Sequence, residues 1–270
     1  MRLLLLLFLI CQGINGQTQV SLKDKVTNLP IAYANIWKEK QLYRSTDSLG
    51  VFKVEEQDLG MEIKITCVGY KDAVLKLSEV LTLDPNPIAL NEVKIVKRKF
   101  EKPIKLGKAK RGDSVYAVQY DAKNGMCAKF FENTSHTAFI NTVKFCASTS
   151  NNNRIVNLLL YSVGENGEPK EIMNTENIIV KLKKGTHIAE VEISNFEIEF
   201  PKEGVFVVIQ HLLLEQNKEY AKPYYPNAFF YEPSIAIDFT NGYKDTWYFK
   251  NETWHKNNGF SVNMELSGSN

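Results

Sequence analysis

The sequence has few of the residues on which most catalytic and metal-binding sites are built. It holds four cysteines and four histidines among 270 residues. No Cys-x-x-Cys pair occurs, and neither does a Gly-x-Ser-x-Gly nucleophile motif or a phosphate-binding glycine-rich loop. The sequence therefore predicts no metal, no cofactor and no catalytic residue, and we expect a protein that is not an enzyme.

One segment has the spacing of a zinc-ligand pair, because His187 is followed three residues later by Glu190. Apolar Ala189, Val191 and Ile193 alternate there with polar residues, and this period of two predicts a β-strand. Residues three apart in a strand point to opposite faces, so the two side chains are not expected to share a metal ion.

Long hydrophobic runs are also absent, apart from Leu3 to Ile10. This run is too short for a bilayer core of roughly 30 Å, which needs about 20 residues. Arg2 precedes it and Gly13 to Gly16 offer a cleavage site, so residues 1–16 are predicted to be a signal peptide. We expect an exported protein without a transmembrane segment in its mature chain. Cys11 is either a lipid-acceptor cysteine or an apolar leader residue, and Ile10 before it favours the second.

Removal of the leader leaves an odd number of cysteines, Cys67, Cys127 and Cys146. Cys67 lies in a β-rich run in which the odd positions are apolar, which predicts a buried thiol. Cys127 and Cys146 are expected to bridge if their strands are neighbours and to stay separate thiols otherwise.

Charge is nearly balanced, with 33 basic and 31 acidic residues. Residues 97–114 hold only one acid, Glu101, among eight bases, so the rest of the chain is mildly acidic. A nucleic-acid-binding face is not expected from this distribution. The basic stretch lacks a β-pattern and contains Pro103 and Gly107, which predicts a linker between two domains.

The segment before this linker, residues 17–96, alternates short β-rich runs with turn residues, as in a β-sandwich. Asp47-Ser48-Leu49-Gly50 is predicted to form a hairpin turn in which Gly50 supplies a positive φ and Phe52 returns to the core.

The order of motifs in this segment resembles the carboxypeptidase-regulatory-like domain, a small transthyretin-like (prealbumin-like) β-sandwich. The resemblance covers Gln19 to about Val96 and rests on these motifs: Leu29-Pro30, Ala34-Asn35-Ile36, Thr46 to Phe52, Val68-Gly69-Tyr70 and Leu90 to Val93. Leu22 departs from the family pattern, which usually has glycine there. The resemblance implies a fold and an exported bacterial context, and no peptidase activity.

Residues 115–270 are again strand-like, with apolar runs such as Ile155 to Val163 and Val205 to Ile209 and a Gly164 to Pro169 turn. This meander without helical periodicity predicts a jelly-roll-like β-sandwich. The segment is similar to a C-terminal domain that often follows regulatory-like domains in exported bacterial proteins of unassigned role. The sequence as a whole thus predicts an all-β chain of two β-sandwich domains.

Aromatic residues gather near the C-terminus and offer rings on which sugars stack. The candidate ligand-binding residues are Tyr224, Tyr225, Tyr231, Trp247 and Trp254. The alternative is that these rings, Trp247 and Trp254 above all, belong to the core. We expect a non-enzymatic binding or assembly module of the bacterial cell envelope, with the first domain as a spacer and the second as the contact surface. Its partner is an unidentified protein or glycan, and a carbohydrate-binding protein that uses the aromatic tail is the alternative.

Overall fold

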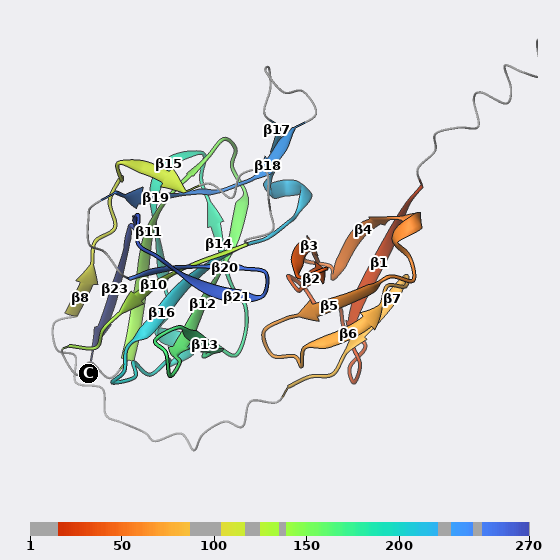
Figure 1. The fold of residues 1–270 in the computed structure, drawn as a ribbon, viewed down its shortest axis with the longest axis horizontal. Coiled ribbons are helices and arrows are strands. Elements are labelled where there is room, and N and C mark those ends of the chain that lie inside the picture. The colour runs from red at the N-terminus through yellow and green to blue at the C-terminus, as the bar shows by residue number, and fades with distance from the viewer. Residues whose placement is uncertain are drawn as a thin grey trace, which may run out of the picture.

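The computed structural model describes residues 16–86, 104–116, 125–134, 139–220, 228–239 and 245–269. Within these ranges the chain is built from strands that form two β-sandwiches (Figure 1), so the predicted all-β class is confirmed. Cys11 and most of the predicted signal peptide lie outside the described residues, as do residues 97–103 of the predicted linker. None of the helical segments in the described ranges has the length and apolarity that a membrane crossing would require.

The first sandwich packs a three-stranded sheet, in the order β4-β1-β7, on a four-stranded sheet, in the order β3-β2-β5-β6. Its strands are β1 (Gln17–Asp24), β2 (Asn35–Lys38), β3 (Gln41–Ser45), β4 (Val51–Glu55), β5 (Glu62–Thr66), β6 (Ala73–Lys76) and β7 (Val80–Leu83), with a 3-10 turn η1 (Glu56–Asp58) after β4. Buried positions alternate along β1 and β5, and Val20, Leu22, Ile63 and Ile65 fill the core between the sheets.

The turn at Asp47 to Gly50 forms with the predicted chemistry. The Asp47 carboxylate accepts hydrogen bonds from the backbone N–H groups of Leu49 at 2.8 Å and Val51 at 3.0 Å, and Gly50 has φ +71°. Phe52 re-enters the core as predicted. The turn is not a hairpin, however, because β3 and β4 belong to different sheets and the turn carries the chain from one sheet to the other.

Replacing Gly50 should therefore be costly in two ways. A Cβ there would lie 2.8 Å from the Leu22 carbonyl oxygen and 2.9 Å from the Ile31 nitrogen, in addition to the strained backbone. Gly50→Ala is expected to lower the free energy of unfolding by about 3 kcal/mol or more in urea titrations. The matched control is Gly60→Ala, which has φ +85° but open space around the new methyl, and should cost only about 1 kcal/mol. Equal losses in the two variants would contradict the steric part of the argument.

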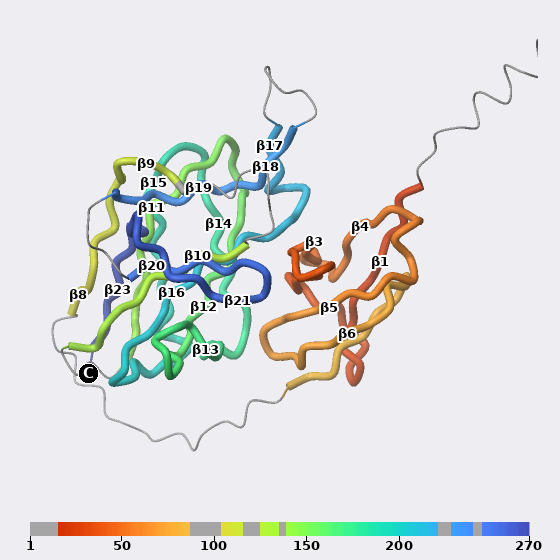
Figure 2. Tube along the Cα trace, viewed as in Figure 1, coloured from red at the N-terminus to blue at the C-terminus, as the bar shows by residue number. Residues whose placement is uncertain are grey.

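The second sandwich consists of two sheets of seven strands each. We call the first the β12 sheet, in the order β13-β12-β16-β10-β20-β21 with β14 also on β12, and the second the β11 sheet, in the order β22-β19-β11-β23-β8 with β15 on β11 and β9 on β19. The chain crosses between them repeatedly, from β10 to β11 and back at β12 (Figure 2). Such crossings are those of the predicted jelly-roll-like sandwich.

The strands of the β12 sheet are β10 (Met126–Phe131), β12 (Arg154–Val163), β13 (Pro169–Ile172), β14 (Ile178–Leu182), β16 (Val205–His211), β20 (Thr246–Lys250) and β21 (Thr253–Asn257). Those of the β11 sheet are β8 (Ile104–Gly107), β9 (Ser114–Tyr116), β11 (Phe139–Thr149), β15 (Gly185–Glu192), β19 (Ser234–Asp238), β22 (Ser261–Val262) and β23 (Met264–Ser269). Two 3-10 turns, η3 (Ser194–Phe196) and η4 (Glu215–Asn217), and a two-stranded ribbon of β17 (Lys218–Tyr220) and β18 (Phe229–Tyr231) complete the second sandwich.

The predicted linker is partly wrong, because its second half belongs to the second sandwich. β8 pairs with β23, and Ser114 begins β9, which pairs with β19. Leu106 packs against the core while Lys105 between the apolar residues is exposed, so the basic residues occupy the outward positions of an edge strand. Lysine is a common residue at such edges because it discourages pairing with other chains.

Both faces of the β12 sheet are apolar. Val156, Leu158 and Leu160 of β12 face the sandwich interior, whereas Leu159 and Tyr161 between them belong to a second cluster on the opposite face. We call that opposite face the outer face, and its buried residues are Met126, Ala128, Leu159, Tyr161, Phe206, Val208 and Trp247. An antiparallel sheet with two apolar faces needs a second cover.

The first sandwich supplies part of that cover. Trp37 and Leu42, from β2 and β3, are buried in the same cluster as the outer face, and the rings of Trp37 and Phe249 lie 5.6 Å apart. A buried hydrogen bond of 3.0 Å runs from the Leu213 N–H to the Ser45 hydroxyl. The two sandwiches are therefore packed together by an apolar contact with a specific polar contact at its margin.

A charge placed in this contact should separate the two sandwiches. Leu42→Asp is expected to bind the dye ANS and to unfold at lower urea concentration, because a carboxylate would replace a side chain that is 4% exposed. Leu49→Asp is the matched control, since Leu49 is 70% exposed on the same sandwich. Wild-type ANS binding by both variants would mean that the contact is not required.

Candidate functional site

The largest described cavity is a cleft of about 730 Å³ between the first sandwich and the outer face of the second. One wall comes from β2, β5 and the loop that follows β5, and the other from β12, β16, β20 and β21. Its floor includes Met126 and Leu159, and its mouth is bordered by Lys170, Glu171 and Ile172 at β13. Small-molecule sites typically have volumes of about 300–1,000 Å³, so the size suits a small ligand.

Four aromatic side chains line this cleft. Trp254 makes edge contacts with Tyr161, at a ring-centroid distance of 5.7 Å, and with Phe249 at 5.1 Å. Phe249 in turn contacts Trp37, whose indole N–H donates to the Thr66 hydroxyl at 2.9 Å. Each ring is held by its neighbours, and Trp254 stays half-exposed at the open side.

A chain of three amides runs from the contact between the sandwiches to the bottom of the cleft. The Asn157 carbonyl oxygen accepts the Ile178 backbone N–H at 3.0 Å, so the Asn157 NH₂ group must face the other way. That NH₂ donates to the Asn177 oxygen at 2.7 Å and to the Gln210 oxygen at 2.9 Å. The Asn177 NH₂ then donates to the Ala32 carbonyl of the first sandwich at 3.3 Å.

This chain leaves a donor without a good acceptor. The Gln210 oxygen is taken by Asn157, so its NH₂ points elsewhere and meets only the Met126 sulfur at 3.7 Å, a weak acceptor. Gln210 is 8% exposed and lines the cleft. The Tyr161 hydroxyl, also in the cleft, has no hydrogen-bond partner within the described ranges, and burial raises its pKa, which keeps it a neutral donor.

Charged groups around the cleft neutralise one another. Lys64 lies 3.4 Å from Asp72 and 3.6 Å from Glu252, and this second ion pair also joins the two sandwiches. Lys170 and Glu171 are neighbours at the mouth. The cleft thus presents neutral donors and aromatic rings, with its charges already paired near the rim.

The described cysteines are all free thiols. Cys67 lines the cleft, half-buried, and burial raises its pKa to about 12, so it is protonated at neutral pH. Cys127 lies on β10 and Cys146 on β11, which belong to opposite sheets, so the neighbouring strands that a disulfide would have needed are not present.

The structure separates the five aromatic residues singled out from the sequence. Tyr224 and Tyr225 lie outside the described residues. Tyr231 and Trp247 are 8% and 9% exposed in the cluster of the outer face, so neither offers a free ring. Trp254 alone among the described three lines the cleft. Trp37, Tyr161 and Gln210 were missed, although the unbroken apolar run around Tyr161 was a sign of a sheet covered on both faces.

His187 and Glu190 lie on β15, so the strand predicted for them is confirmed. His187 bonds the Lys184 carbonyl at 2.7 Å and Glu190 pairs with Lys144 at 3.0 Å. Across the described ranges, no three or more His, Cys, Asp or Glu side chains come together in a way that could hold a metal ion.

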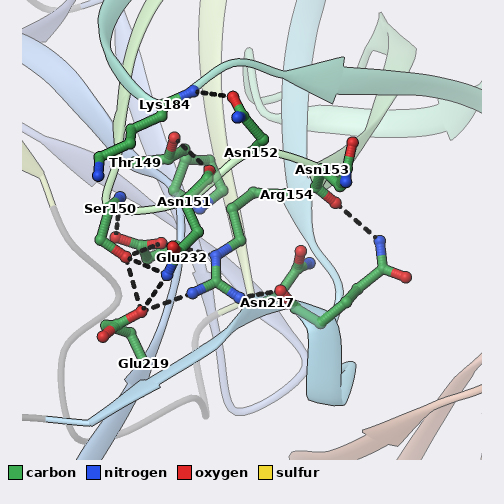
Figure 3. Close-up of polar contacts among 12 residues, drawn as sticks. Thr149, Ser150, Asn151, Asn152, Asn153, Arg154, Lys184, Asn217, Glu219 and Glu232 are labelled. Carbon is green, nitrogen blue, oxygen red and sulfur yellow. Dashed lines mark hydrogen bonds and ion pairs between the residues drawn. The ribbon is translucent and has the colours of Figure 1, made fainter.

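A second polar cluster lies at the base of the β17–β18 ribbon (Figure 3). Arg154, 7% exposed, donates from Nε to Glu232 at 2.7 Å and from Nη2 to Glu219 at 2.6 Å, and it also bonds the Gln216 carbonyl. Ser150 adds its backbone N–H to Glu232 at 2.7 Å and its hydroxyl to Glu219 at 2.6 Å.

Every charged group in this cluster is occupied by another member of it. Removing one partner of a buried ion pair strands the other at a cost of about 3–5 kcal/mol, so these contacts fix the position of the ribbon relative to the β11–β12 turn. The cluster anchors an element of the fold, whereas the cleft is where unpaired polar groups remain.

His211, at the end of β16, is fully buried beside this region. Its Nε2 lies 2.9 Å from the Pro233 carbonyl oxygen and therefore carries the proton, while Nδ1 has no partner in the described ranges. Burial lowers the pKa of His211 to about 4, below its usual value of 6.5.

Stability should therefore fall between pH 6.5 and pH 4. In this window the unfolded chain binds a proton at His211 that the folded chain excludes, so the free energy of unfolding decreases by about 3 kcal/mol as the pH falls. Urea titrations across this range should show the slope in wild type and in His187→Gln, whose histidine is exposed, and a shallower slope in His211→Gln. An unchanged slope in His211→Gln would contradict the assignment.

No model of a known protein family and no curated protein matches the chain. Among solved structures, the cysteine protease and lectin-like domains of Cwp84, a surface-layer-associated protein of Clostridium difficile, are 12% identical with a TM-score of 0.39; the match covers 84% of this chain and 45% of that one. A structure of infectious bursal disease virus, Gx strain, is 11% identical with a TM-score of 0.26, and the match covers 93% and 64% of the two chains. The chain spans less than two thirds of each of these structures, and likeness at this level carries no argument about family or activity.

Proposed function

We propose that the protein is an exported, non-enzymatic binding module of the bacterial cell envelope, and that its ligand occupies the cleft between the two sandwiches. The observation that carries the proposal is the pair of unused polar groups, the Gln210 amide N–H and the Tyr161 hydroxyl, in a cavity of about 730 Å³. Buried polar groups are almost always hydrogen-bonded, and a bound ligand would provide the missing partners.

The first sandwich has more than the spacer role expected from the sequence in this proposal. It contributes Trp37, Lys64 and Cys67 to the cleft, and its Ala32 carbonyl ends the amide chain that orients Gln210. Export rests on the leader-like N-terminus. The resemblance of residues 19–96 to carboxypeptidase-regulatory-like domains, found in exported bacterial proteins, fits the same setting.

The proposal is tested by blocking the mouth of the cleft. Ile172 borders it and is 37% exposed, so Ile172→Arg would place a bulky charged side chain across the entrance without disturbing the core. Immobilised wild-type protein should retain envelope material from the bacterium that encodes it, and Ile172→Arg should retain at least about tenfold less, equivalent to about 1.4 kcal/mol.

The matched control is Ile188→Arg, the same substitution at an isoleucine that is 50% exposed on β15 of the other sheet. It should retain material as wild type does. No retention by wild type would refute a binding function, and equal retention by both variants would place the contact surface outside the cleft.

A further inference from the structure

The chemistry of the cleft also indicates what kind of ligand fits. We infer that the cleft binds a neutral saccharide, a short oligosaccharide whose ring stacks on Trp254 and whose hydroxyl groups bond Gln210 and Tyr161. This inference rests on the proposed function, because it assigns a ligand class to the same cleft.

The charge arrangement disfavours an anionic ligand. Lys64 already faces two carboxylates, Asp72 and Glu252, and Lys170 has Glu171 beside it in the chain. Phosphate and carboxylate ligands are usually held by unpaired Arg or Lys groups, often in bidentate contacts. The charges described in the cleft leave none free, whereas the groups that are free carry no charge.

The free groups match the surface of a sugar ring. Gln210 Nε2 and the Tyr161 hydroxyl are neutral donors close to the aromatic rings, and sugar hydroxyls accept and donate hydrogen bonds in turn. A sugar also has flat C–H faces that pack on aromatic rings. Trp254 is half-exposed and is held by Tyr161 and Phe249, so its ring lies in place before the ligand arrives.

An apolar ligand such as an acyl chain fits less well. It would bury Gln210 and Tyr161 without satisfying them, and each unsatisfied buried group costs about 1–3 kcal/mol. The orientation of Gln210 is also fixed, because its oxygen is bound by Asn157 and Asn157 is in turn fixed by the Ile178 N–H. The amide cannot rotate its N–H groups out of the cleft without breaking that chain.

The inference is tested by titrating the protein with soluble cello-, chito-, xylo- and malto-oligosaccharides, with calorimetry and with acrylamide quenching of tryptophan fluorescence. At least one neutral oligosaccharide should bind and should shield tryptophan fluorescence from quenching. Tyr161→Phe removes only the free hydroxyl and should weaken binding about three- to tenfold, the worth of one neutral hydrogen bond. Tyr248→Phe, on the same sheet but outside the cleft, is the matched control and should bind as wild type does.

Three outcomes would overturn the inference. If no neutral oligosaccharide binds while envelope material is still retained and still blocked by Ile172→Arg, the ligand is of another class and the proposed function stands. If a charged glycan such as polygalacturonate binds and its neutral counterparts do not, the argument from paired charges fails. If Tyr161→Phe and Tyr248→Phe bind a sugar equally, the sugar sits elsewhere. Failure of wild type to retain anything would remove the proposed function together with the inference.

Discussion

The outer face of the β12 sheet is apolar, and the rest of the molecule is arranged around the need to cover it. Leu159, Tyr161, Phe206 and Val208 alternate with the residues that fill the sandwich interior, so the sheet would expose a continuous apolar surface if it stood alone. Trp37 and Leu42 from the first sandwich cover part of this surface. The hydrophobic effect, at about 25 cal/mol per Å² of buried apolar area, therefore acts between the two sandwiches as well as within them.

The cover is incomplete, and the cleft forms where it ends. Phe249 and Trp254 of the β20–β21 hairpin border the uncovered part of the face, and the loop after β5 borders it from the other side (Figure 1). The same apolar strands thus provide both the contact that joins the sandwiches and the aromatic wall of the site. Polar atoms in such a place are expensive unless they are paired, which explains why most of them belong to networks such as the Asn157 chain.

The class of the fold was predictable because it depends on local patterns. The alternation in β1 and the apolar runs of β12 and β16 mark strands, and the Asp47 to Gly50 turn can be recognised from its residues alone. The basic stretch was assigned wrongly because Lys105 lies between Ile104 and Leu106 in a strand too short to show a clear period. Its strand state comes from pairing with β23, more than 150 residues further along the chain, and sequence patterns do not report such a contact.

The candidate site was mostly beyond the sequence for the same reason. Aromatic clustering near the C-terminus pointed to Trp254, and the structure adds Trp37 and Tyr161 from segments that lie about 90 to 220 residues before it. Tyr231 and Trp247 share the composition of Trp254 but face the covered part of the sheet. Only the packing of one sandwich on the other distinguishes a ring that fills a core from a ring that borders a cleft.

The amide chain has a consequence for how the protein is divided for study. The direction of the Gln210 amide at one end is tied, through Asn157 and Asn177, to a backbone carbonyl of the other sandwich. Separating the chain at the natural boundary would leave Asn177 without that carbonyl and would expose the apolar face to water. Each half could keep its sheets, and the recognition properties would still be lost, because they belong to the junction and not to either domain.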